Sequence, residues 1–204
     1  ELFTGDHVST DCAVERGHIK WLRHATGEVG TRGTFRYWTI HAAAMPELAH
    51  FLERWTAEHL ADYCGIVNFE TIDGKIIEAH LRFADQWCDL YGPGWVQALI
   101  EFYTTGRWHF KDNERTDGFS IPLFAHHGHV PRHPSCDALS EIRAMAHVKS
   151  LQITYYEDKA GEDHPMPPGG FRLGVINCTD LKAGLAARRA LAGFFPGTDL
   201  ILLE

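Results

Sequence analysis

The sequence has no runs of basic residues and no excess of positive charge. Lysine and arginine number 19 against 27 aspartate and glutamate residues, which gives a formal net charge of −8 with histidine neutral. Proteins that bind nucleic acid neutralise its phosphates with clustered lysine and arginine, and anionic membrane surfaces attract the same groups. We therefore expect neither nucleic acid nor a membrane surface as a partner.

Paired cysteines and long apolar runs are also missing. The five cysteines are scattered and form no Cys-x-x-Cys pair: Cys12, Cys64, Cys88, Cys136 and Cys178. This distribution is typical of reduced thiols, so we expect a cytoplasmic protein without a signal peptide or a membrane span. The sequence also lacks a P-loop, a Rossmann glycine fingerprint and a nucleophile elbow, the local signatures of three large enzyme classes.

The composition is that of an ordinary globular protein, with 45% hydrophobic and 23% charged residues. Hydrophobic periodicity predicts an α+β fold, a mostly antiparallel sheet with flanking helices. The expected strands are 7–15, 18–24, 34–41, 64–71, 75–82, 119–124, 150–157 and 171–178. The expected helices are 46–63, 93–105, 139–149 and 180–194. Strand 7–15 is predicted to be half-buried, and the glycine-rich segment 25–34 is predicted to be a flexible loop.

Residues 68–82 are the most informative segment, a predicted hairpin that turns at Asp73-Gly74. The polar members of its two strands are Asn68, Glu70, Glu78, His80 and Arg82. A two-residue loop would put the two polar sets on opposite faces, because successive side chains alternate. A three-residue loop, 72–74, pairs Glu70 with Ile76 and brings the polar sets together. We therefore predict Glu70, Glu78, His80 and Arg82 on one face.

Two carboxylates held close together repel each other, and a divalent cation removes that repulsion. Mg²⁺ prefers one or two carboxylates together with phosphate oxygens, and an arginine binds phosphate or carboxylate bidentately. The pattern therefore favours a metal and phosphate site on this face. The alternative is a solvent-exposed hairpin face that carries only surface ion pairs.

These residues resemble the ATP-grasp superfamily, most closely its biotin carboxylase-like branch. In that family a strand ending in Phe-Glu is followed, after a turn, by a strand reading Glu-x-Asn-x-Arg. Residues 68–70 (NFE) and 78–82 (EAHLR) match these two strands. The likeness runs from Glu1 to about Gly106 and weakens beyond. It implies an ATP-grasp large-lobe-like region over 1–110, with a C-terminal α+β extension over 111–204 packed on the same domain.

The resemblance also implies an activity, that of an ATP-dependent carboxylate ligase. Glu70 and Glu78 would bind Mg²⁺ bridging ATP phosphates, with His80 as a third ligand or a phosphate contact. Arg82 would be catalytic, because it would steady the transferring phosphoryl group or the acyl phosphate. Glu1 and His7 fall where the family contacts the nucleotide. The implied cofactors are ATP and Mg²⁺, and the implied substrate is a small carboxylate.

The sequence departs from the family pattern in three ways, and two of them, His80 and the missing small lobe, favour a second hypothesis. His80 stands where the family has asparagine, and imidazole suits softer ions than Mg²⁺. Asp85 is offset from the acid that the carboxylase branch places after the arginine. The family's small lobe has no counterpart in these 204 residues, so a complete ATP site would need that lobe to be supplied, for example upstream in a longer polypeptide. The second hypothesis is a non-catalytic binding module derived from an ATP-grasp enzyme.

Other segments offer weaker candidates. A third hypothesis is a His-rich metal-binding protein. It rests on a group of side chains of the types that bind Zn²⁺: His126, His127, His129, His133 and Cys136. Their spacing fits no established zinc-binding pattern. Residues 164–172 could place Gly169 and Gly170 near a substrate, with Arg172 as an anion anchor. The 27–33 loop with Arg32 could close over phosphates. All three segments also fit plain surface loops.

Overall fold

The computed structural model describes residues 3–31, 33–164 and 170–201, and it divides into two compact units. Unit 1 comprises residues 1–27 and 39–117, and unit 2 comprises residues 28–38 and 118–204. The strand pairs are antiparallel and helices flank them, so the predicted α+β class with a mostly antiparallel sheet is confirmed. The predicted domain boundary near residue 110 stays a prediction.

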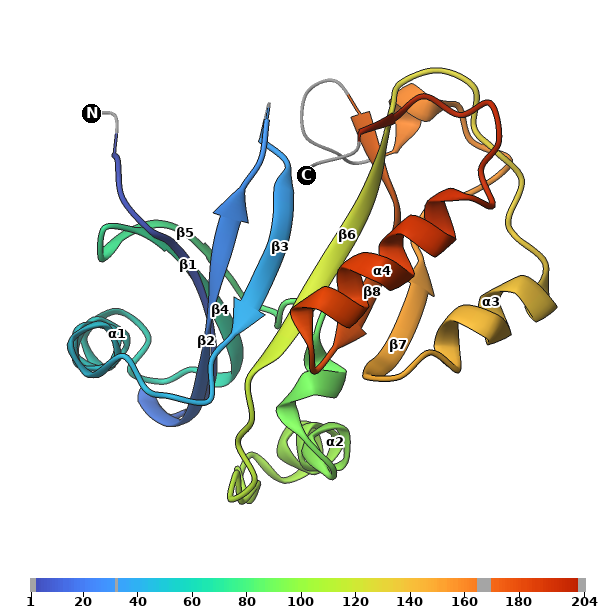
Figure 1. The fold of residues 1–204 in the computed structure, drawn as a ribbon. Coiled ribbons are helices and arrows are strands. Elements are labelled where there is room, and N and C mark those ends of the chain that lie inside the picture. The colour runs from blue at the N-terminus through green and yellow to red at the C-terminus, as the bar shows by residue number, and fades with distance from the viewer. Residues whose placement is uncertain (1–2, 32, 165–169, 202–204) are drawn as a thin grey trace. The chain divides into compact units, whose positions relative to one another are not determined.

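Unit 1 contains the N-terminal strands and the predicted hairpin, in the spatial order β5-β4-β1-β2 (Figure 1). Its strands are β1 (His7–Glu15), β2 (His18–Val29, which ends in unit 2), β4 (Cys64–Ile72) and β5 (Lys75–His80). Its helices are α1 (Pro46–His59), α2 (Trp95–Thr105) and the short 3₁₀ helix η1 (Cys88–Tyr91). Among the described residues, no helix is both long and apolar enough to cross a bilayer.

Strand β1 is buried on both faces, so the prediction of a half-buried strand was wrong. Every residue from Val8 to Val14 is buried. On one face Cys12 and Val14 join a core cluster with Leu52 of helix α1. On the other face Asp11 contacts Tyr91 of η1. The alternation of polar and apolar residues in β1 indicated that only its apolar face is covered. Its polar face is also covered, because η1, which is distant in the sequence, packs there.

The β4–β5 hairpin brings its polar side chains together by a route other than the predicted one. Ile72 pairs with Lys75, so the loop has two residues, and Asp73 and Gly74 both have positive φ (51° and 72°), as a type I′ turn requires. The register then shifts between Glu70 and Thr71, which leaves one extra residue in β5. A two-residue loop alone would put the polar side chains of the two strands on opposite faces, and this β-bulge brings them back to the same face. Glu70 therefore lies opposite Glu78, and the predicted pairing of Glu70 with Ile76 was wrong.

Unit 2 has the strand order β3-β6-β8-β7, with the short β9 paired to β6. Its strands are β3 (Phe35–Ile40, which ends in unit 1), β6 (Gly118–His126), β7 (Val148–Ile153), β8 (Gly170–Cys178) and β9 (Leu200–Ile201). Its helices are α3 (Cys136–Arg143), α4 (Leu181–Ala192) and the 3₁₀ helix η2 (Gly161–Asp163). The core lies between the sheet and helices α3 and α4, where Leu123, Ile142, Phe171 and Leu191 are almost fully buried.

Several predicted boundaries were wrong for local reasons. Residues 25–29 continue strand β2 instead of forming a loop, and residues 25–27 pair with β1. Helix α1 ends at His59, not at residue 63, because the chain must turn before Cys64 pairs with Glu15. Helix α3 begins three residues earlier than predicted, because the Ser135 hydroxyl accepts a hydrogen bond from the Ala138 amide and caps the helix. Strand β9 and both 3₁₀ helices were not predicted.

Gly184 provides a test of packing in unit 2. A Cβ at this position of α4 would lie 2.5 Å from Ile121 Cδ1 and would also collide with the Cys178 sulfur. Gly184→Ala should therefore lower the free energy of unfolding by about 1–3 kcal/mol through overpacking, although alanine raises helix propensity by about 1 kcal/mol. Urea unfolding measures the change, with Ala190→Gly at an exposed position of the same helix as the propensity control. A Gly184→Ala variant more stable than wild type would contradict the close packing of Gly184 against Ile121 and Cys178.

Candidate functional site

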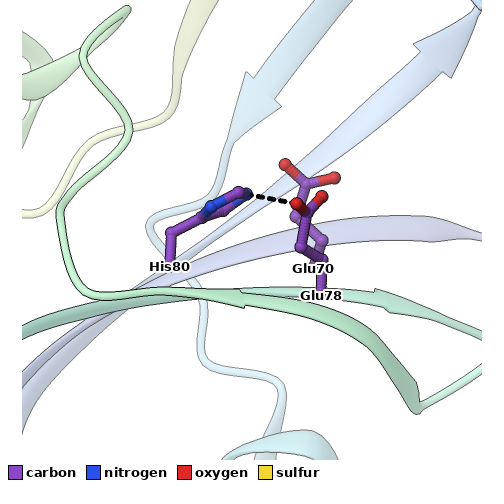
Figure 2. Close-up of side chains that lie close together, drawn as sticks. All are labelled: Glu70, Glu78 and His80. Atoms are coloured by element: carbon purple, nitrogen blue, oxygen red, sulfur yellow. Dashed lines mark ion pairs between the residues drawn. The ribbon is translucent and has the colours of Figure 1, made fainter.

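The hairpin gathers two carboxylates and an imidazole on one face. Glu70 lies directly opposite Glu78, and Asn68 lies opposite His80. Glu70, Glu78 and His80 each offer a ligand atom, and these atoms all lie within 4.8 Å of one another. His80 Nε2 is 3.3 Å from Glu78 Oε1. Figure 2 shows the three side chains standing on the same side of the hairpin. The prediction that they share a face is therefore confirmed.

The first residue of β1 orients one of these carboxylates. His7 Nε2 lies 2.9 Å from Glu70 Oε2, and the two side chains are 15% and 26% exposed. The hydrogen bond from His7 lowers the pKa of Glu70 and outweighs the opposing effect of burial. The charges of His80 and Arg82 lower this pKa further. Glu70 is thus held in the ionised form that binds metal ions.

A fully buried carboxylate lies beside this cluster, and the sequence analysis did not identify it. Asp11 Oδ1 accepts a hydrogen bond from Asn68 Nδ2 (2.7 Å), and Asp11 Oδ2 accepts one from the Tyr91 hydroxyl (2.6 Å). The amide of Ala84 donates to both Asp11 oxygens, each at 3.0 Å. Burial raises the pKa of Asp11 to about 6, although these hydrogen bonds and the charge of Arg82 act to lower it. Asp11 therefore connects the cluster's strand β4 to the chain that follows Arg82.

Arg82 lies next to the cluster rather than within it. It lies two residues beyond the end of β5, is exposed, and donates from Nη1 to the backbone oxygen of Phe83 at 3.0 Å. Its charge lowers the pKa of both Glu70 and Asp11. The guanidinium therefore adds positive charge near these carboxylates. Because Arg82 lies beyond the end of β5, its predicted place on the shared face stays a prediction.

The other predicted candidates do not assemble into a site. Among the described residues, the only group of three or more histidine, cysteine or acidic side chains within ligand distance is Glu70, Glu78 and His80. His127 and His133 instead contact the backbone oxygens of Gly161 and Tyr155, so the zinc hypothesis for residues 126–136 is not supported. Arg172 donates to the Thr154 hydroxyl. Three predicted site residues lie outside the described residues: Glu1, Arg32 and Gly169.

The donor set of the cluster fits a divalent cation. Two carboxylates supply negative charge and oxygen ligands, and the imidazole supplies a nitrogen ligand. Glu78 is 56% exposed at its side chain, so the cluster is open to solvent on one side. A bound cation would remove the repulsion between two acids directly opposite each other, which is unfavourable in a sheet. It would also leave coordination positions for phosphate oxygens.

Comparisons with known proteins identify the fold. No family model and no curated protein sequence matches the chain significantly. Among solved structures, it is similar over its whole length to an L-amino acid ligase from Bacillus licheniformis, with 13% identity and a TM-score of 0.63. It is also similar, over 96% of its length, to the phosphoribosylaminoimidazole carboxylase ATPase subunit from Aquifex aeolicus (13%, 0.60). A third match, over 98%, is phosphoribosylamine–glycine ligase from Thermotoga maritima (18%, 0.57).

The chain corresponds to only part of these enzymes. It covers 53%, 57% and 56% of the three chains, so it spans about half their length. Other matches include a biotin carboxylase domain, at 10% identity, and the assignment to the biotin carboxylase-like branch stays a prediction. Identities this low establish the architecture and not the activity. The chain has the ATP-grasp fold.

Proposed function

We propose that this chain is the metal- and phosphate-binding large lobe of an ATP-dependent carboxylate ligase. One observation carries the proposal: Glu70 and Glu78 lie opposite each other with His80 beside them, on a chain with the ATP-grasp fold. Two of the three similar structures described above are ligases, one of amino acids and one of phosphoribosylamine with glycine. Their names support the general kind of reaction and leave this chain's own substrate open.

In this proposal, Glu70 and Glu78 hold the divalent ion that accompanies ATP, and Mg²⁺ is the family's usual ion. The ion supplies charge neutralisation at the phosphates when bound. His7 orients Glu70 through the 2.9 Å contact, in addition to the nucleotide contact that the resemblance assigns to it. Glu1 keeps its proposed nucleotide contact, which lies outside the described residues. Asp11 holds the strand and the segment after Arg82 together.

The proposed reaction has two steps. The γ-phosphoryl group passes from ATP to a carboxylate oxygen of the substrate, which gives ADP and an acyl phosphate. An amine or similar nucleophile then attacks the acyl carbon and displaces inorganic phosphate. In this proposal the positive charge of Arg82 stabilises the phosphoryl group in transfer, since catalysis of this kind depends on positioning and electrostatic stabilisation. A small lobe, supplied upstream in a longer polypeptide, would complete the nucleotide site.

Calorimetric titration with ADP tests the binding half of this proposal. We expect the chain to bind ADP when Mg²⁺ or Mn²⁺ is present and not when EDTA removes the metal, because the phosphates would be held through the ion. ADP binding that is equally strong in EDTA would contradict the proposal that Glu70 and Glu78 hold the phosphates through a metal ion. An absence of binding with either metal would contradict the proposed function for this chain.

Arg82→Gln tests the assigned phosphate contact. Hydrogen bonds to charged groups contribute about 1.5–3 kcal/mol, so we expect metal-dependent binding of ATP to weaken about 10- to 100-fold. The matched control is Arg54→Gln, an exposed arginine of helix α1 in the same unit, which should leave ATP binding unchanged. Equal affinity in the Arg82 variant and the control would remove Arg82 from the proposed site.

A further inference from the structure

We propose that His80 makes this cluster a site for a first-row transition metal ion, of the Mn²⁺, Co²⁺ and Zn²⁺ class, in preference to Mg²⁺. The inference rests on the proposed function, because it concerns the metal that accompanies the nucleotide. It goes beyond that function by naming the class of metal from the chain's own ligands. Among these, the nitrogen of His80 stands where the family has the amide oxygen of an asparagine.

The backbone puts the imidazole where a third ligand belongs. The pairs Glu70–Glu78 and Asn68–His80 are successive on the same face of the hairpin. Two ligand atoms that bind one ion at about 2.1 Å, at right angles, lie about 3 Å apart. His80 Nε2 and Glu78 Oε1 are 3.3 Å apart, and the largest separation within the cluster is at most 4.8 Å. Small side-chain adjustments would therefore bring all three donors onto one ion.

The chemistry of the donors then selects the ion. Mg²⁺ takes oxygen ligands in near-ideal octahedral geometry and loses its waters reluctantly. Imidazole suits zinc, iron, nickel and copper, carboxylates suit Mn²⁺, and the affinity of a mixed site generally rises from Mn²⁺ to Co²⁺. The set of Glu70, Glu78 and His80 leaves the remaining positions of a six-coordinate ion open for phosphate oxygens. A nitrogen ligand therefore strengthens binding of a transition metal and adds little for Mg²⁺.

The surroundings fix two of the ligands. His7 contacts Glu70 Oε2 at 2.9 Å, and a hydrogen-bonded carboxylate is a better-oriented ligand. His80 is 26% exposed at its side chain, and its backbone is paired with buried Asn68. Asn68 is in turn hydrogen-bonded to Ser9 and Asp11. The alternative is that His80 forms only a surface ion pair with Glu78, and it predicts no metal selectivity.

Metal titration of wild type, His80→Asn and His80→Gln distinguishes a transition-metal site from a surface ion pair between His80 and Glu78. Free Mn²⁺ is measured by electron paramagnetic resonance with and without ADP, Co²⁺ by its visible absorption, and Mg²⁺ by competition against Mn²⁺. We expect wild type to bind Mn²⁺ and Co²⁺ at least about 10-fold more tightly than the His80→Asn variant, with Mg²⁺ affinity changed less than about twofold. The control is His50→Asn, an exposed histidine of helix α1, which should behave as wild type.

The possible results distinguish the metal preference from the function itself. If wild type and both His80 variants bind Mn²⁺, Co²⁺ and Mg²⁺ with the same relative affinities, the preference is overturned and the proposed metal–nucleotide site stands. If wild type binds none of these ions with or without ADP, both proposals fail. Circular dichroism and urea unfolding confirm that each variant is folded, and agreement between the Asn and Gln variants excludes an effect specific to one substitution.

Discussion

Replacing Glu70 and Glu78 together by glutamine is expected to weaken metal-dependent ADP binding by at least about 100-fold. The substitution removes both negative ligands from a cluster whose only other ligand is His80. Changing a residue that merely orients a ligand costs about 10- to 100-fold in metal affinity, so losing two direct ligands should cost more. Calorimetry with Mn-ADP and Mg-ADP measures the loss.

Stability should change little in the same double variant, which separates binding from folding. Removing the charges relieves the repulsion between two acids directly opposite each other. It also removes the ion pair between His7 and Glu70, which is partly exposed and contributes about 1 kcal/mol or less. A matched control is Glu58→Gln/Glu101→Gln, which changes two exposed acids of unit 1. Unaltered ADP binding in the Glu70/Glu78 variant would contradict the assigned ligands.

Asp11→Ala is expected to lower the free energy of unfolding by at least about 3 kcal/mol. The carboxylate accepts hydrogen bonds from Asn68, Tyr91 and the Ala84 amide, and alanine would leave these buried donors without that acceptor. Each unsatisfied buried donor costs about 1–3 kcal/mol. Urea unfolding at pH 7 measures the change. A loss below about 1 kcal/mol would contradict the view that Asp11 joins strand β4 to the segment after Arg82.

Asp11→Asn keeps the shape of this side chain and removes its charge, so it isolates the effect of pH. The pKa of Asp11 is raised from 3.8 to about 6 by burial, so between these values the folded protein binds a proton more readily than the unfolded chain. The contribution of Asp11 to stability is therefore full below about pH 4 and declines as pH rises to about 6. The difference in unfolding free energy between wild type and Asp11→Asn should decline over the same range. A difference that is constant with pH would contradict the raised pKa.

The hairpin shows how far the sequence could predict the site. Alternation of polar and apolar residues predicted that Glu70, Glu78 and His80 share a face, and the structure confirms it. The register was wrong because a three-residue loop and a two-residue loop followed by a bulge both restore the same alternation. The bulge puts Glu70 opposite Glu78 instead of Ile76. Sequence alternation alone does not distinguish these two solutions.

Asp11 was missed because its environment is not local. The strand 7–15 has an apolar alternation that indicates one buried face, and an acidic residue on the other face suggests solvent. The partners that bury Asp11, Ala84 and Tyr91, are 73 and 80 residues away in the sequence. The only local signal was an acid flanked by Thr10 and Cys12 inside a predicted strand. Such burial depends on tertiary packing rather than on local pattern.

Helix α3 was misplaced although a local signal was present. Ser135 follows Pro134 and precedes the helix, and serine is among the preferred N-cap residues. The histidine- and proline-rich composition of 125–138 suggested a loop over the whole segment, and this hid the cap. By contrast, the end of α2 at Thr105 was predicted, and Gly106, which follows it, has the left-handed φ of 71° that favours glycine there.

The central claim is that Glu70 and Glu78 hold a divalent ion together, and a crystal structure of the chain grown with ADP and Mn²⁺ tests it most directly. Anomalous scattering locates Mn²⁺ without reference to the surrounding atoms. The account predicts one peak at about 2.1–2.3 Å from an oxygen of each carboxylate, with His80 as a further ligand and ADP phosphate oxygens in the open positions. A peak elsewhere in the chain, or ordered ADP with no metal between Glu70 and Glu78, would contradict it.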